Sequence, residues 1–175
     1  MSKLILQTAI SFSILLLTAI TVEAQIIKPG VTLGINLLGS LPQGDFKDEY
    51  SLGAGGEIFG GVGWGRTFLL ATAGYSAFKA ASDNGKGGIL TYIPLKIGVK
   101  QYFLRKLLFI NADLGIASVK NKLFNESRFT RGVGAGIKLL GLEAGLYYDG
   151  WKNIDPQAKG FQNSIFSKLG YSFTF

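Results

Sequence analysis

The residues of this chain that could carry acid–base or ion-pair chemistry recur at every second position of short apolar segments. In Ile93–Lys100 the even positions include two lysines, and the odd positions are all aliphatic. Across the chain, four lysines and four carboxylates share such a polar register: Glu57, Lys96, Lys100, Asp113, Lys138, Glu143, Asp149 and Lys168. Charges of both signs on one face predict ion pairs, which offset part of the desolvation cost inside a closed structure.

Catalysis is the weakest interpretation of these groups. The chain has no His and no Cys, which excludes a Ser–His–Asp nucleophile and the commonest protein ligands of zinc. Glu143 and Asp149 could in principle act as a general acid and base, but pairing with the lysines explains them better. We therefore expect a non-enzymatic protein with no catalytic residue, no metal site and no cofactor.

Strict alternation between apolar and polar residues indicates the elements that hold these charges. It recurs, beside Ile93–Lys100, in Val31–Leu37, Leu108–Ala117, Gly132–Leu139, Leu142–Asp149 and Lys168–Phe175. Two further segments do not reveal their inward register. Residues 52–62 are diluted by glycine, and residues 68–78 are apolar in both registers.

The breaks between these segments alternate between short and long. Short breaks occur near residues 65–66, 104–106 and 140–141, and the long polar ones span residues 39–51, 80–88, 119–127 and 152–163. This spacing predicts four hairpins, hence eight strands of about 9–11 residues each. Short turns at one end and longer loops at the other are typical of an all-β, eight-stranded antiparallel transmembrane up-and-down barrel.

The N-terminal segment has the features of a secretory signal peptide. A basic start at Lys3 precedes an apolar run over residues 4–22, and small Ala24 stands before a plausible cleavage point. We predict a cleaved signal peptide at residues 1–24 and a barrel domain at residues 25–175; a retained membrane anchor is the alternative. After residue 24 no segment reaches the roughly 20 apolar residues that a spanning helix needs.

Two kinds of barrel fit the alternation, and they differ in which register faces inward. A soluble lipocalin-like ligand carrier would bury the apolar register. A membrane barrel would turn it toward lipid and keep charges in the lumen. The polar register here is rich in glycine, including Gly132, Gly134 and Gly136, which suits a narrow lumen where small residues leave room for long ones. We also expect aromatic girdles at the membrane interfaces, formed by Trp64, Phe68, Tyr102, Phe103, Tyr147, Tyr148, Trp151, Phe173 and Phe175.

Several stretches resemble the outer-membrane β-barrel domain family of small OmpA/OmpX-like barrels. They are "LTYIPLKIGVKQYF", "GDF" at residues 44–46, "GVGAGIKLLGLEAGLYY" and the terminal "LGYSFTF". The resemblance covers residues 25–175 and implies no shared catalytic residue. It implies that aromatic residues on the last strand, Tyr171, Phe173 and Phe175, are the signal that the barrel-assembly machinery reads.

These observations favour a structural or surface-binding protein in the outer membrane of a Gram-negative cell, monomeric and with both termini periplasmic. Basic residues gather near the expected outer rim: Lys79, Lys86, Lys120, Lys122, Arg128, Arg131, Lys152 and Lys159. Clustered cations attract the phosphates of lipopolysaccharide, and we expect four of them, Lys120, Lys122, Arg128 and Arg131, to contact these phosphates. Nucleic acid is a poor alternative because an exported barrel seldom meets it. A small or gated pore for small solutes is the other open function, although eight strands leave little lumen.

Overall fold

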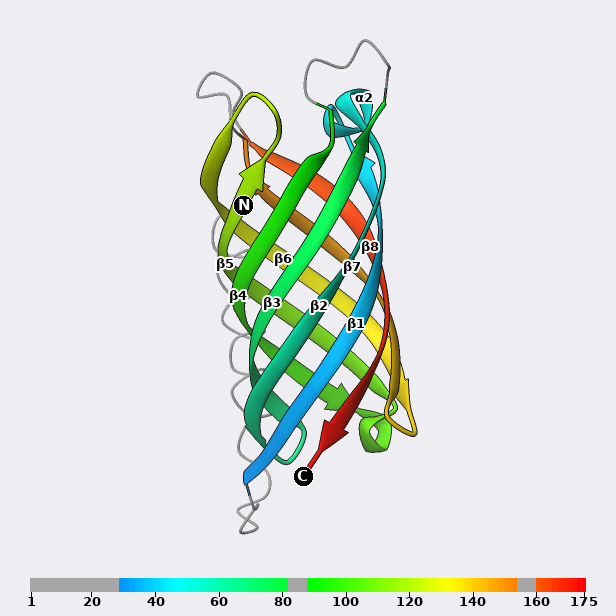
Figure 1. The fold of residues 1–175 in the computed structure, drawn as a ribbon. Helices are drawn as coiled ribbons and strands as arrows, with labels where there is room; N and C mark the ends of the chain where they lie inside the picture. Colours follow the sequence, from blue (N-terminus) through cyan, green and yellow to red (C-terminus); the bar gives the residue numbers. More distant parts are fainter. Residues whose placement is uncertain (1–28, 82–87, 154–159) are drawn as a thin grey trace, which may run out of the picture.

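The computed structural model describes residues 29–81, 88–153 and 160–175, whose strands close into one barrel in chain order with every neighbour antiparallel (Figure 1). The strands are β1 (Pro29–Gln43), β2 (Tyr50–Trp64), β3 (Thr67–Ala80), β4 (Leu90–Phe103), β5 (Leu108–Lys120), β6 (Asn125–Leu139), β7 (Leu142–Lys152) and β8 (Phe161–Thr174). The predicted all-β, eight-stranded antiparallel barrel is confirmed. The predicted signal peptide, residues 1–24, lies outside the described residues.

The barrel closes where the first strand meets the last. β1 pairs with β8 in register from Thr32–Thr174 to Gln43–Asn163. Below this ladder, the Val31 amide donates to the Phe175 carbonyl at 3.1 Å, and the Phe175 amide donates to the Val31 carbonyl at 2.9 Å. Closure leaves no open strand edge, which is the condition for placing a sheet in hydrocarbon, where an unsatisfied backbone group costs several kcal/mol.

The strands are strongly tilted, as Figure 1 shows. A path that follows paired residues around the ring leaves β1 at Leu33 and returns to β1 at Gln43, ten residues further along. The residues on that path are Gly60, Ala71, Ile97, Leu114, Arg131, Gly150 and Asn163. Such a stagger fixes both the tilt and the narrow radius of an eight-stranded barrel.

Short and long connections lie at opposite ends of the barrel, which are called here the turn end and the loop end. The expected strand length of 9–11 residues holds for β7, which has 11, and is wrong for the other seven strands, which have 13 to 15. The expected loop 119–127 shrinks to residues 121–124, and β1 continues through Gln43. Polar composition does not end a strand, because its backbone can stay paired beyond the apolar zone. Of the expected loops 80–88 and 152–163, residues 82–87 and 154–159 lie outside the described chain.

A four-residue helix, α2 (Phe46–Glu49), lies at the mouth on the loop end (Figure 1). Phe46 is 1% exposed. Its ring centroid lies 5.0 Å from that of Trp151, 5.2 Å from that of Tyr50 and 5.3 Å from that of Phe78. The helix therefore anchors an aromatic cap inside the mouth. The other short helix, η1 (Leu104–Lys106), forms a connection at the turn end. Within the described ranges, no helix has the length and apolar character needed to span a membrane.

The side chains divide cleanly between an apolar outside and a mixed inside. Ile97 is 60% exposed and Leu114 is 51% exposed, whereas Lys96 is 4% exposed. The two undecided segments are now assigned. In β2 the odd positions that include Glu57 face inward, and in β3 the even positions do so, from Phe68 to Phe78. The apolar register is thus the outer one, as the membrane-barrel interpretation requires.

The prediction that all nine aromatic residues form interface girdles is wrong for four of them. Phe68, Tyr102, Tyr147 and Trp151 are at most 5% exposed and point into the barrel. The other five are outward-facing and lie near the strand ends: Trp64, Phe103, Tyr148, Phe173 and Phe175. Aromatic rings fill both ends of this lumen because its narrow radius leaves a core to be packed rather than an open channel.

Glycine in the inward register makes room for these large side chains. A Cβ atom at Gly34 would overlap the ring of Phe59, and one at Gly134 would overlap the ring of Tyr147. A Cβ at Gly170 would meet the side-chain amide of Asn36. The glycines therefore leave space for rings and polar groups in the narrow lumen of an eight-stranded barrel.

Candidate functional site

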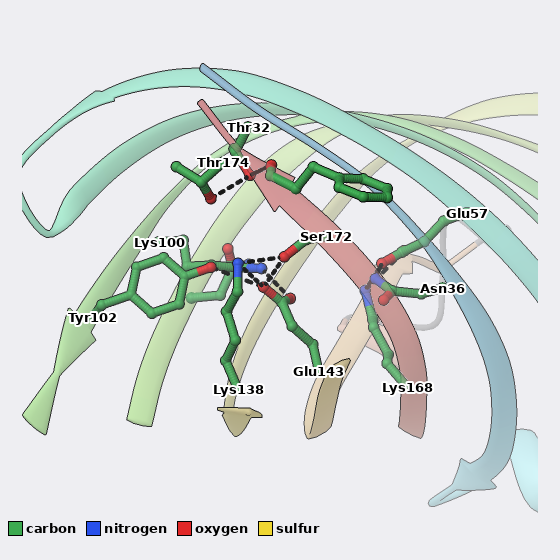
Figure 2. A network of polar contacts seen from close by, with 12 residues as sticks. Thr32, Asn36, Glu57, Lys100, Tyr102, Lys138, Glu143, Lys168, Ser172 and Thr174 are labelled. Atoms are coloured by element: carbon green, nitrogen blue, oxygen red, sulfur yellow. Dashed lines mark hydrogen bonds and ion pairs between the residues drawn. The ribbon is translucent and has the colours of Figure 1, made fainter. Parts of the chain in front are cut away.

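All eight sequence-predicted lumen charges point into the barrel, and the structure brings them together in three groups. Each group joins strands that are distant in sequence, because the closed sheet faces its own interior. Two of the groups are drawn in Figure 2. We name each group after one member: the Lys96 group, the Lys168 group and the Glu143 group.

The Lys96 group joins one ammonium to two carboxylates. Lys96 Nζ lies 3.1 Å from Asp113 Oδ1 and also bonds to Asp149. Tyr92 donates its hydroxyl to Asp149 at 3.2 Å, and the Tyr92 and Thr130 hydroxyls lie 2.6 Å apart. β4, β5, β6 and β7 each contribute to this group, so it ties half of the ring together across the lumen.

The Lys168 group is a compact bidentate pair. Lys168 Nζ donates to both carboxylate oxygens of Glu57 at 2.8 Å, and both side chains are 8% exposed. Asn36 donates its amide to Glu57 at 2.8 Å, as Figure 2 shows. The ammonium also lies 4.1 Å from the ring centroid of Tyr147. Every polar atom at this charge is engaged, which is what a low-dielectric interior demands.

The Glu143 group lies nearer the turn end and is the most densely bonded. Glu143 accepts hydrogen bonds from Lys100 at 2.7 Å, from the Tyr102 hydroxyl at 2.8 Å and from the Ser172 hydroxyl at 2.7 Å. Lys138 lies 3.5 Å from the same carboxylate and donates to Ser172 at 2.5 Å. Figure 2 shows these side chains converging from β4, β6, β7 and β8. Both carboxylate oxygens are therefore bonded, Oε1 to two hydroxyls and Oε2 to Lys100.

The pairing of each buried carboxylate with a lysine limits the chemistry that the interior can perform. The two carboxylates considered for acid–base chemistry, Glu143 and Asp149, belong to different groups, and a different lysine binds each. Four lysines and four carboxylates balance in charge. Aromatic layers flank them, with Phe46 and Trp151 toward the loop end and Phe68 packed on Tyr102 toward the turn end. The charges of the interior therefore sum to zero, and their cross-links tie strands together across the lumen.

Sequence reasoning missed the uncharged members of these groups. Tyr92, Tyr102 and Ser172 complete the bonding of the buried carboxylates. Their signal was available in the alternation, because Tyr92 and Tyr102 share the even positions of β4 with Lys96 and Lys100. Whether an aromatic residue occupies an even or an odd position of its strand therefore predicts its side of the barrel better than its distance from the strand end does.

The structure separates the four rim residues that the sequence suggested. Lys120 and Lys122 are exposed at the end of β5 and in the following loop. Arg131 is exposed on the outer face of β6, and its guanidinium lies 4.0 Å from the ring centroid of Phe161. Arg128 lies in the inward register of β6, is half-buried, and bonds to Glu126. Two of the other suggested cations, Lys86 and Lys159, lie outside the described residues.

The outer face carries charge of one sign only. Within the strands that the structure describes, the charged residues of the outward register are all cations in the loop-end half of their strands. Lys79, Lys120 and Lys152 lie at the loop ends of β3, β5 and β7, and Arg131 lies nearer the middle of β6. We call these four residues the cationic collar. The exposed acids described at this end lie elsewhere: Asp45 precedes α2, Asp48 and Glu49 are on α2, and Glu126 bonds to Arg128. These cations, on β3, β5, β6 and β7, give the loop-end half of the outer wall a positive potential.

The suggested assembly signal lies on the outside of the last strand. Tyr171, Phe173 and Phe175 share the outward register of β8 near the turn end and are 38%, 57% and 77% exposed. The rings of Tyr171 and Phe173 lie 4.8 Å apart, and those of Phe173 and Phe175 lie 6.5 Å apart. The three rings thus form a continuous exposed ladder beside the seam between β8 and β1.

Comparison with known proteins finds likeness in structure but not in sequence. No protein-family model matches the chain, and no curated protein matches it either. The solved structure of Ail, the attachment invasion locus protein of Yersinia pestis, superposes with a TM-score of 0.54 at 12% identity, covering 85% of this chain and 100% of Ail. Neisserial surface protein A (NspA) superposes with a TM-score of 0.55 at 12% identity, covering 83% of this chain and 95% of NspA.

A second structure of Ail, in complex with the heparin analogue sucrose octasulfate, superposes with a TM-score of 0.53 at 13% identity. It covers 84% of this chain and 100% of Ail. At such low identity these similarities establish the fold alone. This chain therefore has the architecture of the small OmpA/OmpX-like eight-stranded barrels.

Proposed function

We propose that this protein is a non-enzymatic outer-membrane barrel of a Gram-negative cell that binds polyanions at its outer rim, with lipopolysaccharide as its main partner. The turn end, with Pro29 and Phe175, then faces the periplasm, and the loop end faces outward. The barrel-assembly machinery would insert it by reading the ladder of Tyr171, Phe173 and Phe175. One observation carries the binding role: the outward charges of the described strands are all cations, and all lie in the loop-end half of their strands.

The apolar belt supports the membrane location. Large aliphatic side chains such as Leu37, Ile58 and Leu95 are 59–70% exposed on the outer wall. A water-soluble monomer rarely exposes a contiguous apolar patch of more than a few hundred Å². Acyl chains would cover this belt without a hydration cost, and the collar would then lie at the level of lipid phosphates and sugars.

The rim geometry refines the expected contacts to phosphate. Lys120, Lys122 and Arg131 are exposed and lie toward the outer surface. Arg128 contributes mainly to the overall charge, because it lies in the inward register and already bonds to Glu126. The shared fold of Ail, which has been solved with sucrose octasulfate, supports a second ligand of similar chemistry, a sulfated saccharide.

A charge-reversal experiment tests the proposal. Lys120, Lys122 and Arg131 are changed together to Glu, and the lipopolysaccharide that copurifies with each barrel is measured. The matched control reverses three cations of the turn end, Arg66, Arg105 and Lys106. We expect the rim variant to retain at least tenfold less lipopolysaccharide than the control, because it loses all three attractive charges at the site. Equal retention by the two variants would remove the proposed role of the rim.

The same pair of variants tests the sulfated ligand. Sucrose octasulfate is titrated into detergent-solubilised barrel, and the heat of binding is recorded. The rim variant should bind it much more weakly than the turn-end control, and the signal for the native barrel should fall as salt is raised. Absence of binding to the native barrel would leave lipopolysaccharide as the sole polyanion of the proposal.

A further inference from the structure

The outer wall has a hollow below one member of the cationic collar. The hollow has a volume of about 740 Å³, lies on the outside of β4 to β8 and is lined mainly by apolar side chains. Its floor is made of small residues, since Ala112 and Ala135 are outward-facing, on adjacent strands, and diagonal to each other in the ladder. Val99 and Ile110 border it on one side, and Leu146 and Tyr148 border it on the other.

A second hollow continues from the first around the barrel. It covers about 780 Å³ and shares Ala135 and Leu146 with its neighbour. Its floor is again made of small outward residues, Gly39, Ala144 and Ser167. The opposite wall gives a comparison, because the outward residues Ala54 and Ala77 on β2 and β3 line neither of these two hollows.

Arg131 stands at the loop end of the first hollow. It occupies the next outward position above Val133, which lines the hollow, so the two Cα atoms are about 7 Å apart along β6. Its paired neighbour on β7 is Gly150, which has no side chain to cover it. Among the described residues, no carboxylate forms a salt bridge with Arg131, and its guanidinium stacks on Phe161. An exposed cation, positioned by its stacking on Phe161, therefore lies on the loop-end side of an apolar trough.

We propose that the hollow below Arg131 is a specific site for one phosphorylated, acylated glycolipid of the outer leaflet, with one acyl chain in the trough and a phosphate on Arg131. This inference rests on the proposed function: the trough would bind the acyl chain, and Arg131 would bind the phosphate. A flexible acyl chain gains dispersion contacts along a trough of apolar side chains. The guanidinium offers a planar, bidentate fit to phosphate.

The position of the cation selects the occupant. Arg131 lies on the loop-end side of the hollow, and its guanidinium reaches Phe161, the first residue of β8 at the loop end. A lipid with its headgroup at that end can therefore place a phosphate there while its chain runs down past Ala135 toward Ile110. A lipid of the opposite leaflet would place its headgroup near Gln101, at the other end of the trough, where the outward register carries no charge. Among the described residues around the hollow, a partner helix would find one cation, Arg131, and no carboxylate.

The test fills the trough without touching the cations. Ala112→Leu and Ala135→Leu are combined, and the matched control combines Ala54→Leu and Ala77→Leu on the opposite wall. A third variant, Arg131→Gln, removes the charge alone. Purified barrels in detergent are titrated with lipid A, and bound molecules are counted by native mass spectrometry. Parallel titrations use lipid A without phosphates and lipid A without acyl chains. Heat-modifiable migration on a gel verifies that each variant is folded.

We expect the filled trough to raise the dissociation constant of the tightest lipid A molecule at least tenfold, and the control to change it less than twofold. Arg131→Gln should weaken phosphorylated lipid A and leave the phosphate-free form unchanged. If the filled barrel binds lipid A as well as the native one does, the trough is not a site. In that case the rim-reversal experiment still decides the proposed function on its own. A variant that binds acyl-free lipid A as tightly as the native barrel but loses the acylated form would support the trough directly.

Discussion

The most informative prediction concerns the Lys168–Glu57 pair, because it reports whether the lumen is dry. Glu57→Gln removes one charge and keeps the shape of the side chain. It leaves the Lys168 ammonium, now 8% exposed, without its carboxylate partner. Removing one partner of a buried pair typically costs about 3–5 kcal/mol. Lys168→Met should cost a similar amount, and the double variant should cost less than the sum of the two.

The expected coupling follows from the geometry. At 2.8 Å, Coulomb attraction between unit charges amounts to about 6 kcal/mol for an effective dielectric constant near 20 and about 1.5 kcal/mol in bulk water. After desolvation is subtracted, a coupling energy of about 2–3 kcal/mol is expected for a contact in a shared buried network. The exposed pair at the loop end, Arg128 with Glu126, is the matched control. Its side chains are 22% and 43% exposed, and its coupling should stay below about 1 kcal/mol.

The assay is urea unfolding of the refolded barrel in lipid vesicles, followed by tryptophan fluorescence. Trp151 is fully buried in the mouth and Trp64 is exposed on the outer wall, so unfolding changes both environments. The free energies of unfolding of the four proteins in each double-mutant cycle give the coupling energy. If the buried pair couples no more strongly than Arg128 with Glu126, water reaches the interior freely. The filled lumen would then be wrong, and the small-pore function would become the better interpretation.

Three further predictions follow from the fold. Ile97→Arg places a cation in the middle of the apolar belt and should destabilise the barrel in bilayers by about 2–4 kcal/mol; an equal stability for Ile97→Arg and the loop-end change Ser118→Arg in vesicle unfolding would contradict the outward assignment. Phe46→Ala removes the central ring of the mouth cap and should cost about 3–5 kcal/mol and speed proteolysis of α2, as limited digestion can show. Phe175→Ala should lower the amount of assembled barrel in cells more than refolding yield in detergent, because the proposed signal acts on the assembly machinery; a parallel loss in both would indicate a folding role instead.

The sequence predicts the parts of this structure that alternation controls. Lys96 and Lys100 face inward and Ile97 faces outward because the pleat of a strand sends successive side chains to opposite faces. The same rule predicts that the eight lumen charges face inward, but it does not predict which of them form ion pairs with each other. Which lysine meets which carboxylate depends on the stagger of the ring, and stagger is a property of all eight pairings together.

The sequence fails where alternation is lost. Residues 52–62 contain glycine on both faces, so Glu57 alone had to indicate the register. In residues 68–78, Phe68 and Phe78 face inward because rings fill the ends of the lumen, which removes the contrast between the two registers. The buried ring of Phe46 was also missed, since "GDF" occurs in a polar stretch and only the closed mouth reveals a cavity that its ring can fill.

The closed seam between β1 and β8 restricts how a protein of this shape can change its size during evolution. Every strand of this barrel is antiparallel to both of its neighbours. Adding a single strand would force one parallel pairing at the seam where Val31 now pairs with Phe175. Growth or shrinkage therefore proceeds by whole hairpins. The gain or loss of a hairpin would change the barrel diameter and therefore which residues face each other across the lumen. New ion-pair partners would have to arise with each such change.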